Sequence, residues 1–110
     1  MISCIIPACN EAGHLDNLIF DINEIPKISE IVIVEGGSKD NTWQVALAMQ
    51  EKYPQKVHAI KQTGKGKFNA VLEGAAAANE RFIMIWDADA TVSLKSSLAL
   101  IRIVGSEDQF

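Results

Sequence analysis

Several features that define other classes of protein are missing from this sequence. Its 110 residues include only two cysteines, Cys4 and Cys9, and neither has metal-ligand companions at zinc-finger spacing. We therefore expect two reduced thiols, Cys4 as a small apolar strand residue. The chain has ten Lys and Arg and fourteen Asp and Glu, which give a net charge of −4. It therefore lacks the basic surface through which proteins bind nucleic acids or anionic membranes. No apolar run approaches the ~20 residues of a membrane span, and no basic, signal-like segment precedes the apolar residues 2–6. These absences predict a cytoplasmic protein without a transmembrane segment.

The sequence has the composition of an ordinary globular domain, with 48% hydrophobic and 22% charged residues. Short apolar runs alternate with segments of helical spacing. The pattern predicts strands over residues 2–6, 30–35, 57–61 and 81–86, and helices over about 15–25, 41–53, 68–79 and 93–104.

The order β-α-β-α-β-α-β-α is typical of a parallel sheet with helices on both faces, a Rossmann-like three-layer α/β sandwich. No linker or composition change divides the chain, so we expect a single domain over residues 1–110.

The predicted fourth strand ends in two carboxylates, Asp87 and Asp89. In parallel α/β sheets, ligands bind at the carboxyl ends of the strands. At ~4 Å and an effective dielectric of about 20, the two charges repel by about 4 kcal/mol. A hard divalent cation such as Mg²⁺ or Mn²⁺ removes this cost. The same spacing also fits an acidic turn that caps the following helix, with Asp87 exposed.

Two further strand ends suit a nucleotide. Glu35 ends the second predicted strand beside Gly36, where a flat ligand can approach the backbone and the carboxylate can accept hydrogen bonds from a base or ribose. The segment Gly64-Lys65-Gly66-Lys67 opens a helix, where amides, the helix dipole and two ammonium groups favour a diphosphate. The structural alternatives are a solvated glutamate in a tight turn and a flexible surface loop. His14 and His58 have no evident partner and receive no role.

Together these motifs resemble family 2 glycosyltransferases, the inverting enzymes of the GT-A fold that use nucleotide-diphosphate sugars. The segment Ile5-Ile6-Pro7-Ala8-Cys9-Asn10-Glu11 is similar to the family's opening strand with its Pro and Asn-Glu. Residues 34–42 resemble its Asp-Asp-Gly-Ser-x-Asp-x-Thr turn, residues 64–74 its Gly-Lys-Gly…Gly segment, and residues 87–89 its Asp-x-Asp motif. The similarity spans residues 2 to about 92 in the family's order.

The resemblance implies a role for each motif residue. Lys65 or Lys67 would lie near the base or diphosphate. Asp87 would face the ribose or sugar, and Asp89, with Asp87, would hold the Mg²⁺ or Mn²⁺ that bridges the diphosphate. The uridine or guanosine nucleoside of the UDP- or GDP-linked sugar would be held by Pro7, Ala8, Cys9, Asn10, Glu11, Glu35 and Gly36. The acceptor is not implied; a lipid acceptor would place the protein peripherally at a membrane.

The sequence departs from the family in two respects. Glu35 and Gly36 occupy the positions of the usual two aspartates of the turn. The family's acceptor half, which supplies the general base, follows the Asp-x-Asp strand. Here only Glu107 and Asp108 carry carboxylates after Thr91, and we assign neither as the base. We therefore expect a truncated, donor-binding half that is inactive alone.

Two other interpretations of the function stay open. One is a non-catalytic module that binds a nucleotide sugar. The other, less favoured, is a haloacid-dehalogenase-like phosphatase, whose first motif the segment Asp87-x-Asp89-x-Thr91 also resembles.

The family's strand order, three-two-one-four, would leave the apolar residues 81–86 at an open edge of the sheet. An unpaired apolar edge strand is a pairing site, so the sequence predicts self-association through it.

Overall fold

The computed structural model describes residues 1–88 and 99–102. Within them, five strands form one sheet in the order β3-β2-β1-β4-β5. Strands β1 to β4 are parallel, as the alternating pattern predicted, and β5 is antiparallel to β4. The elements are β1 (Ile2–Ala8), α1 (Leu15–Asn23), β2 (Ile28–Glu35), α2 (Thr42–Lys52), β3 (Val57–Lys61), α3 (Lys67–Ala77), β4 (Phe82–Ile85) and β5 (Ala99–Arg102).

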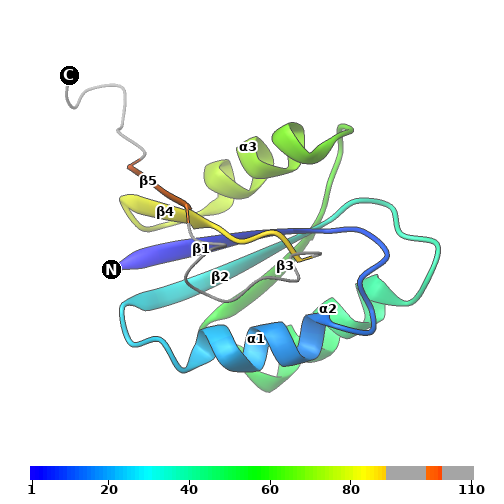
Figure 1. Ribbon diagram of the computed structural model, residues 1–110, viewed down its shortest axis with the longest axis horizontal. Coiled ribbons are helices and arrows are strands. Elements are labelled where there is room, and N and C mark those ends of the chain that lie inside the picture. The colour runs from blue at the N-terminus through cyan, green and yellow to red at the C-terminus, as the bar shows by residue number, and fades with distance from the viewer. Residues whose placement is uncertain (89–98, 103–110) are drawn as a thin grey trace.

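The sheet lies between two helical layers, with α1 and α2 on one face and α3 on the other (Figure 1). Alternating side chains of the strands feed two hydrophobic cores. In β1, Cys4 and Ile6 join the core beneath α1 and α2, whereas Ile5 joins the core beneath α3. The apolar stripe of α1, Leu15, Ile19 and Ile22, is fully buried against the first core. Helical spacing therefore identified the buried face of α1 correctly.

Strand β1 continues through Pro7 to Ala8, two residues further than the sequence predicted. A proline in a central strand normally removes a hydrogen bond of the ladder. Here Ile5 O accepts a bond from Trp86 N on the β4 side, and β4 itself ends opposite Ile5. Since residues two apart present their backbone groups to the same side, Pro7 faces the side where no β4 residue pairs, and no ladder bond is lost.

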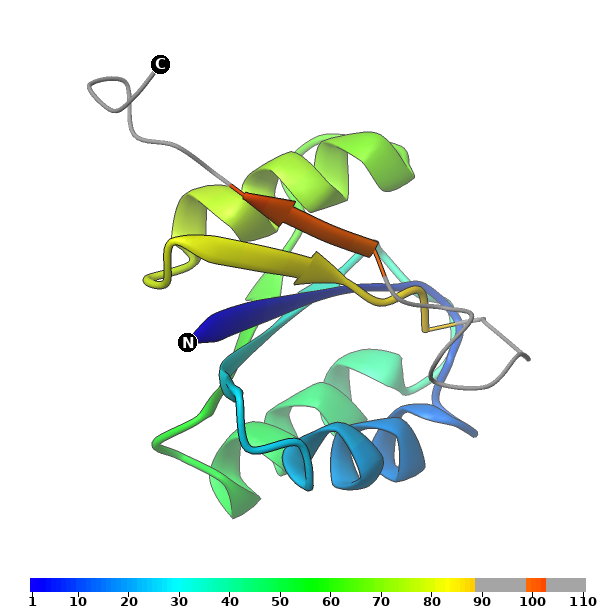
Figure 2. The same cartoon turned by 60° about the vertical axis from the view of Figure 1, so that its left-hand side comes forward.

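The helix predicted over residues 93–104 is wrong at residues 99–102, which form β5. Figure 2 shows β5 running beside β4 in the opposite direction. Leu98, Ile101 and Val104 have helical spacing, but a short apolar run fits a strand equally well, and the backbone groups along β4 provide a partner. The remainder of the predicted helix, residues 93–98 and 103–104, lies outside the described residues.

β5 also corrects the prediction of an open edge at β4. All four residues of β4 pair with β5, Phe82 with Arg102 through to Ile85 with Ala99. The edge that would have supported self-association is therefore occupied. No helix of the described residues is both long and apolar enough to cross a membrane.

Candidate nucleotide-sugar site

The carboxyl edge of the sheet forms a pocket of about 240 Å³. Strands β1, β2 and β3 end level with one another, because Ala8 pairs with Glu35 and Glu35 with Lys61. β4 ends earlier, so its continuation to Asp87 and the loop before α3 border the space beyond the sheet. The lining residues come from all four parallel strands or the segments that follow them: Pro7, Ala8, Cys9, Glu11, Val34, Gly36, Gln62, Gly66, Lys67, Ala70 and Asp87.

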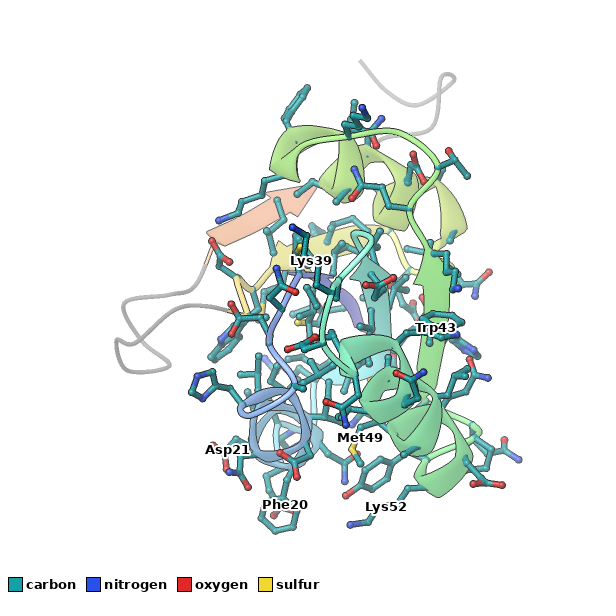
Figure 3. The ribbon with its side chains drawn as sticks, turned by 90° about the vertical axis from the view of Figure 1, so that its right-hand side faces the viewer. Phe20, Asp21, Lys39, Trp43, Met49 and Lys52 are labelled. Carbon is teal, nitrogen blue, oxygen red and sulfur yellow. The ribbon has the colours of Figure 1, made fainter. Side chains whose placement is uncertain are left out.

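The loops after β1 and β2 are bonded to each other. Asn10 adopts a left-handed conformation with φ 57°, and its backbone N donates to Ser38 Oγ at 2.9 Å. Asn10 Oδ1 in turn accepts from Lys39 N at 2.8 Å. In Figure 3, which looks onto this edge, Lys39 lies between the layer of α1 and α2 and the layer of α3. Asn10 thus holds the two loops together and does not line the pocket.

A second pair of contacts joins the same loops near the start of α2. Glu11 N donates to Thr42 Oγ1 at 2.8 Å, and Ala12 N donates to Asp40 Oδ2 at 3.3 Å. The hydroxyl and backbone N–H of Thr42 donate to Asp40, and these bonds, the hydroxyl's above all, hold the pKa of Asp40 below its ordinary value. The Asn-Glu and Ser-x-Asp-x-Thr motifs therefore form one hydrogen-bonded unit beside the pocket, to whose lining Glu11 contributes.

Glu35 is buried, with 4% of its surface exposed, and its carboxylate turns back over its own loop. Ser38 N donates to Glu35 Oε2, and Gly37, with φ 75°, supplies the left-handed turn between them. Burial acts to raise the pKa of Glu35, but hydrogen bonds from Ser38 and Gly37 and the nearby Lys61 ammonium outweigh it and lower that pKa. Lys61 also lies over the Trp43 ring, 5.0 Å from its centroid, where Trp43 flanks β3 (Figure 3).

The carboxylate of Glu73, in α3, holds the loop between β3 and α3 in place by hydrogen bonds. Thr63 N and Gly64 N each donate to this carboxylate at 2.8 Å, and these bonds lower the pKa of Glu73. Gly66, at φ 88°, turns the chain into α3. Lys65 is exposed and does not line the pocket.

Lys67, in the first turn of α3, forms an ion pair with Asp87 beyond β4. The Lys67 side chain is 57% exposed and that of Asp87 34% exposed. The Asp87 carboxylate, which the sequence predicted to bind a metal, is thus already paired with the Lys67 ammonium. Asp87 supplies the hard oxygen atoms that Mg²⁺ and Mn²⁺ prefer. The described residues contain no group of three or more His, Cys, Asp and Glu able to hold a metal, and Asp89 lies outside them.

The pocket brings together most of the residues that the sequence singled out. Among its lining are Pro7, Ala8, Cys9, Glu11, Gly36, Lys67 and Asp87, whereas Asn10, Glu35 and Lys65 lie behind or beside it.

The sequence did not indicate three lining residues, Val34, Gln62 and Ala70, whereas Gly66 belongs to the loop predicted for the diphosphate. Gln62 directly follows β3, so the strand-end rule that selected Glu35 would have found it. Ala70 lies one helical turn after Gly66, at a position that spacing alone does not distinguish from core.

The comparisons with known proteins agree with this architecture. The sequence profile of "Glycosyl transferase family 2" matches residues 3–107, and the chain belongs to this family. The dolichol-phosphate mannosyltransferase of Pyrococcus furiosus is 38% identical over 91 residues, which are 80% of this chain and 25% of that protein. The dolichyl-phosphate beta-glucosyltransferase of Dictyostelium discoideum is 31% identical over 106 residues, covering 86% of this chain and 32% of its own length.

A solved structure gives the same picture. A mannosyltransferase of Pyrobaculum calidifontis, in complex with GDP-Man and Mn²⁺, superposes with a TM-score of 0.73 at 26% identity. The superposition covers 81% of this chain and 27% of that one. The GT-A-type α/β fold is therefore confirmed, and the chain spans about a quarter to a third of the length of these relatives.

Proposed function

We propose that the chain forms the donor-binding part of a metal-assisted, inverting glycosyltransferase that uses a UDP- or GDP-linked sugar. The pocket carries this proposal: one space at the carboxyl edge is lined by an ammonium at a helix start, a carboxylate after a buried strand, and glycine backbone. These are the groups that a diphosphate, a cation and a flat base require.

Each group has a defined task in this proposal. Pro7, Ala8, Cys9 and Glu11 at and after the end of β1, with Gly36 after β2, contact the nucleoside. Asn10 and Glu35 support it indirectly, by holding the two loops in place. The ammonium of Lys67, with Lys65 as the neighbouring alternative, holds the diphosphate at the start of α3. Asp87 faces the ribose or sugar. Asp87 and Asp89 hold Mg²⁺ or Mn²⁺, which when bound would neutralise the departing diphosphate.

The names of the relatives indicate the chemistry of donor and acceptor. Two relatives are named for transfer to dolichol phosphate, and one solved relative holds GDP-Man with Mn²⁺. We extend this to a phosphorylated lipid acceptor, which would bring the protein to a membrane surface while its donor site faces the cytoplasm.

A second candidate function is a module that binds a nucleotide sugar without transferring it. The contacts of two carboxylates at this edge favour the binding module: Glu35 is hydrogen-bonded to its own turn, and Asp87 is paired with Lys67. Neither is placed to deprotonate an acceptor hydroxyl. Product formation separates the two functions, whereas nucleotide binding is common to both.

Calorimetry with UDP and GDP, each with and without Mn²⁺, tests the proposed site. We expect binding that depends on Mn²⁺ and that is weakened at least about tenfold by Asp87→Asn, because the variant lacks the charge that the cation requires. Asp21→Asn on the exposed surface of α1 is the matched control (Figure 3). Equal affinity with and without the metal would contradict the metal site, and no binding of either nucleotide would contradict the proposed function.

A further inference from the structure

Gln62 is a pocket residue whose backbone is fixed by the sheet. Its N–H donates to Glu35 O at 2.8 Å, which extends the pairing of β2 and β3 by one residue beyond Lys61. The side chain is half-buried and lines the pocket. The position of this carboxamide is therefore determined by secondary structure.

The orientation of the carboxamide is also determined. Nε2 donates to Gly66 O at 2.9 Å and to Asn69 Oδ1 at 2.7 Å. Since a backbone carbonyl only accepts hydrogen bonds, the group facing Gly66 O must be the NH₂ and not the oxygen. Both N–H groups of Gln62 are then occupied. Within residues 1–88, no group donates a hydrogen bond to Gln62 Oε1.

The remaining oxygen lies against the backbone of a second lining residue. A Cβ placed on Gly36 would lie 3.1 Å from Gln62 Oε1 and 3.6 Å from the Cβ of Cys9. Gly36, Cys9 and the Gln62 oxygen therefore form an uncharged corner of the pocket, next to bare glycine backbone that a flat ring can approach. A diphosphate held at Lys67 leaves this corner for the base.

We propose that Gln62 selects the base of the donor by accepting a hydrogen bond from a protonated ring nitrogen. Uracil offers N3–H and guanine N1–H, whereas cytosine and adenine carry an unprotonated acceptor at the equivalent ring position. Two acceptors would then face each other, and the Gln62 oxygen would be left without a hydrogen-bond donor once the base displaces water from it. An unsatisfied group of this kind costs about 1–3 kcal/mol, so we expect at least about a tenfold preference for UDP or GDP. This inference rests on the proposed function.

The test compares the affinities of UDP, CDP, GDP and ADP for the chain in Mn²⁺ buffer by calorimetry. We expect the wild type to favour UDP over CDP, or GDP over ADP, by about tenfold or more. Gln62→Met removes the acceptor at similar length and should abolish this preference by weakening only the favoured nucleotide. Asn69→Ala removes one acceptor of the Gln62 NH₂ but leaves Gly66 O to orient the carboxamide, so this variant should retain the preference. Gln44→Met, on the exposed face of α2, is the matched control and should change nothing.

The base preference, and not the affinity itself, is the decisive measurement. Loss of the bonds to Gly66 and Asn69 would loosen the loop and weaken all four nucleotides alike. Equal weakening by Gln62→Met, or no preference in the wild type, would overturn the role of Gln62 and leave the proposed function intact. No binding of any nucleotide by the wild type would overturn both. If Gln62→Met does not fold, as judged by circular dichroism, Gln62→Leu takes its place, and retention of the preference in that variant overturns the inference.

Discussion

The ion pair between Lys67 and Asp87 changes how the acidic motif after β4 is understood. From the sequence, Asp87 was either one of two repelling carboxylates that a metal joins or an exposed residue of an acidic turn that caps a helix. In the structure the Lys67 ammonium already faces Asp87, and both side chains keep a substantial exposed fraction. Exposed pairs of this kind contribute about 0–1 kcal/mol to stability, so breaking this one leaves the fold nearly unchanged. Both groups can therefore exchange partners when a charged ligand arrives.

Lys67→Met should weaken UDP or GDP binding by about tenfold or more, because it removes a charge-assisted contact to the diphosphate. Lys65→Met is the matched variant two residues earlier, on a side chain that does not line the pocket, and should change affinity much less. Calorimetry gives the affinities, and thermal melts should show nearly equal stability for both variants. A larger loss from Lys65→Met would transfer the diphosphate contact to that residue.

The motif residues could be identified from the sequence, but their partners could not. Asn10 and Ser38 are far apart in the chain, as are Glu11 and Thr42, and the pairs meet only because β1 and β2 are neighbours in register. The sequence assigned Asn10 and Glu35 to the ligand, whereas in the structure their polar atoms bond to the loops that form the site. Side-chain direction at a strand end depends on these contacts and has no signature in spacing.

At the scale of elements, the buried carboxylate of Glu30 in β2 connects β1 with the segment that precedes β4. Glu30, only 6% exposed, accepts bonds from Ser3 Oγ at 2.6 Å and from Asn79 N at 2.8 Å. His58, for which the sequence indicated no partner, places its Nε2 3.7 Å from Glu30 Oε2. Burial acts to raise the pKa of Glu30, but the bonds from Ser3 and Asn79 and the charge of His58 outweigh it and lower that pKa. The connection between α3 and β4 is thereby anchored to β1 and β2.

Glu30→Gln should lower the free energy of unfolding by about 1–3 kcal/mol, because the amide cannot accept every bond that the carboxylate accepts. Since the folded pKa of Glu30 lies below the ordinary value of 4.5, its contribution is complete above that pH and is lost as the pH falls through the folded pKa. Urea unfolding at several pH values should therefore show a shallower acid decline for Glu30→Gln than for wild type. The exposed Glu51→Gln serves as the control and should follow the wild-type profile. Parallel acid profiles for wild type and Glu30→Gln would contradict this role.

The contact of α3 with the sheet depends on Gly74. A Cβ at this position would lie 2.4 Å from Ile5 Cγ2 and 2.9 Å from Val34 Cγ2, both in the core. Replacing a mid-helix glycine by alanine ordinarily stabilises by about 0.5–1 kcal/mol, but overpacking costs about 1–3 kcal/mol and should dominate here.

Gly74→Ala should therefore lower the melting temperature. Gly13→Ala, where no atom lies within 4 Å, should not. A melting temperature of Gly74→Ala equal to or above wild type would mean that α3 shifts away from the sheet at little cost.

At the scale of the whole molecule, the parallel four-strand sheet was predictable because short apolar-rich segments, weakest in residues 57–61, alternate with segments of helical period. The position of β5 was not, because its four residues have no period long enough to separate helix from strand. Only the tertiary pairing with β4 decides between them. The same pairing occupies the edge of β4 on which the predicted self-association depended. The wrong prediction of a helix at residues 99–102 therefore also led to the wrong prediction of an open edge at β4.

The 110-residue chain should bind a nucleotide diphosphate but glycosylate no hydroxyl acceptor. Inverting transfer to a hydroxyl requires a base within hydrogen-bond reach of that hydroxyl, because its proton must be removed. At the carboxyl edge Glu35 bonds to its own turn, Asp87 pairs with Lys67, and Glu11 belongs to the loop proposed for the nucleoside.

Mass spectrometry after incubation with GDP- or UDP-linked sugars, Mn²⁺ and a lipid alcohol such as dolichol measures transfer to a hydroxyl, with calorimetry on the same sample verifying that the donor site is intact. Slow release of free sugar is compatible with the prediction, since hydrolysis by water needs no acceptor site. A glycosylated lipid would contradict it and would require a base among the residues that the structure does not describe, where Glu107 and Asp108 are the carboxylates after Thr91. Alanine substitution of each would then identify which of them acts.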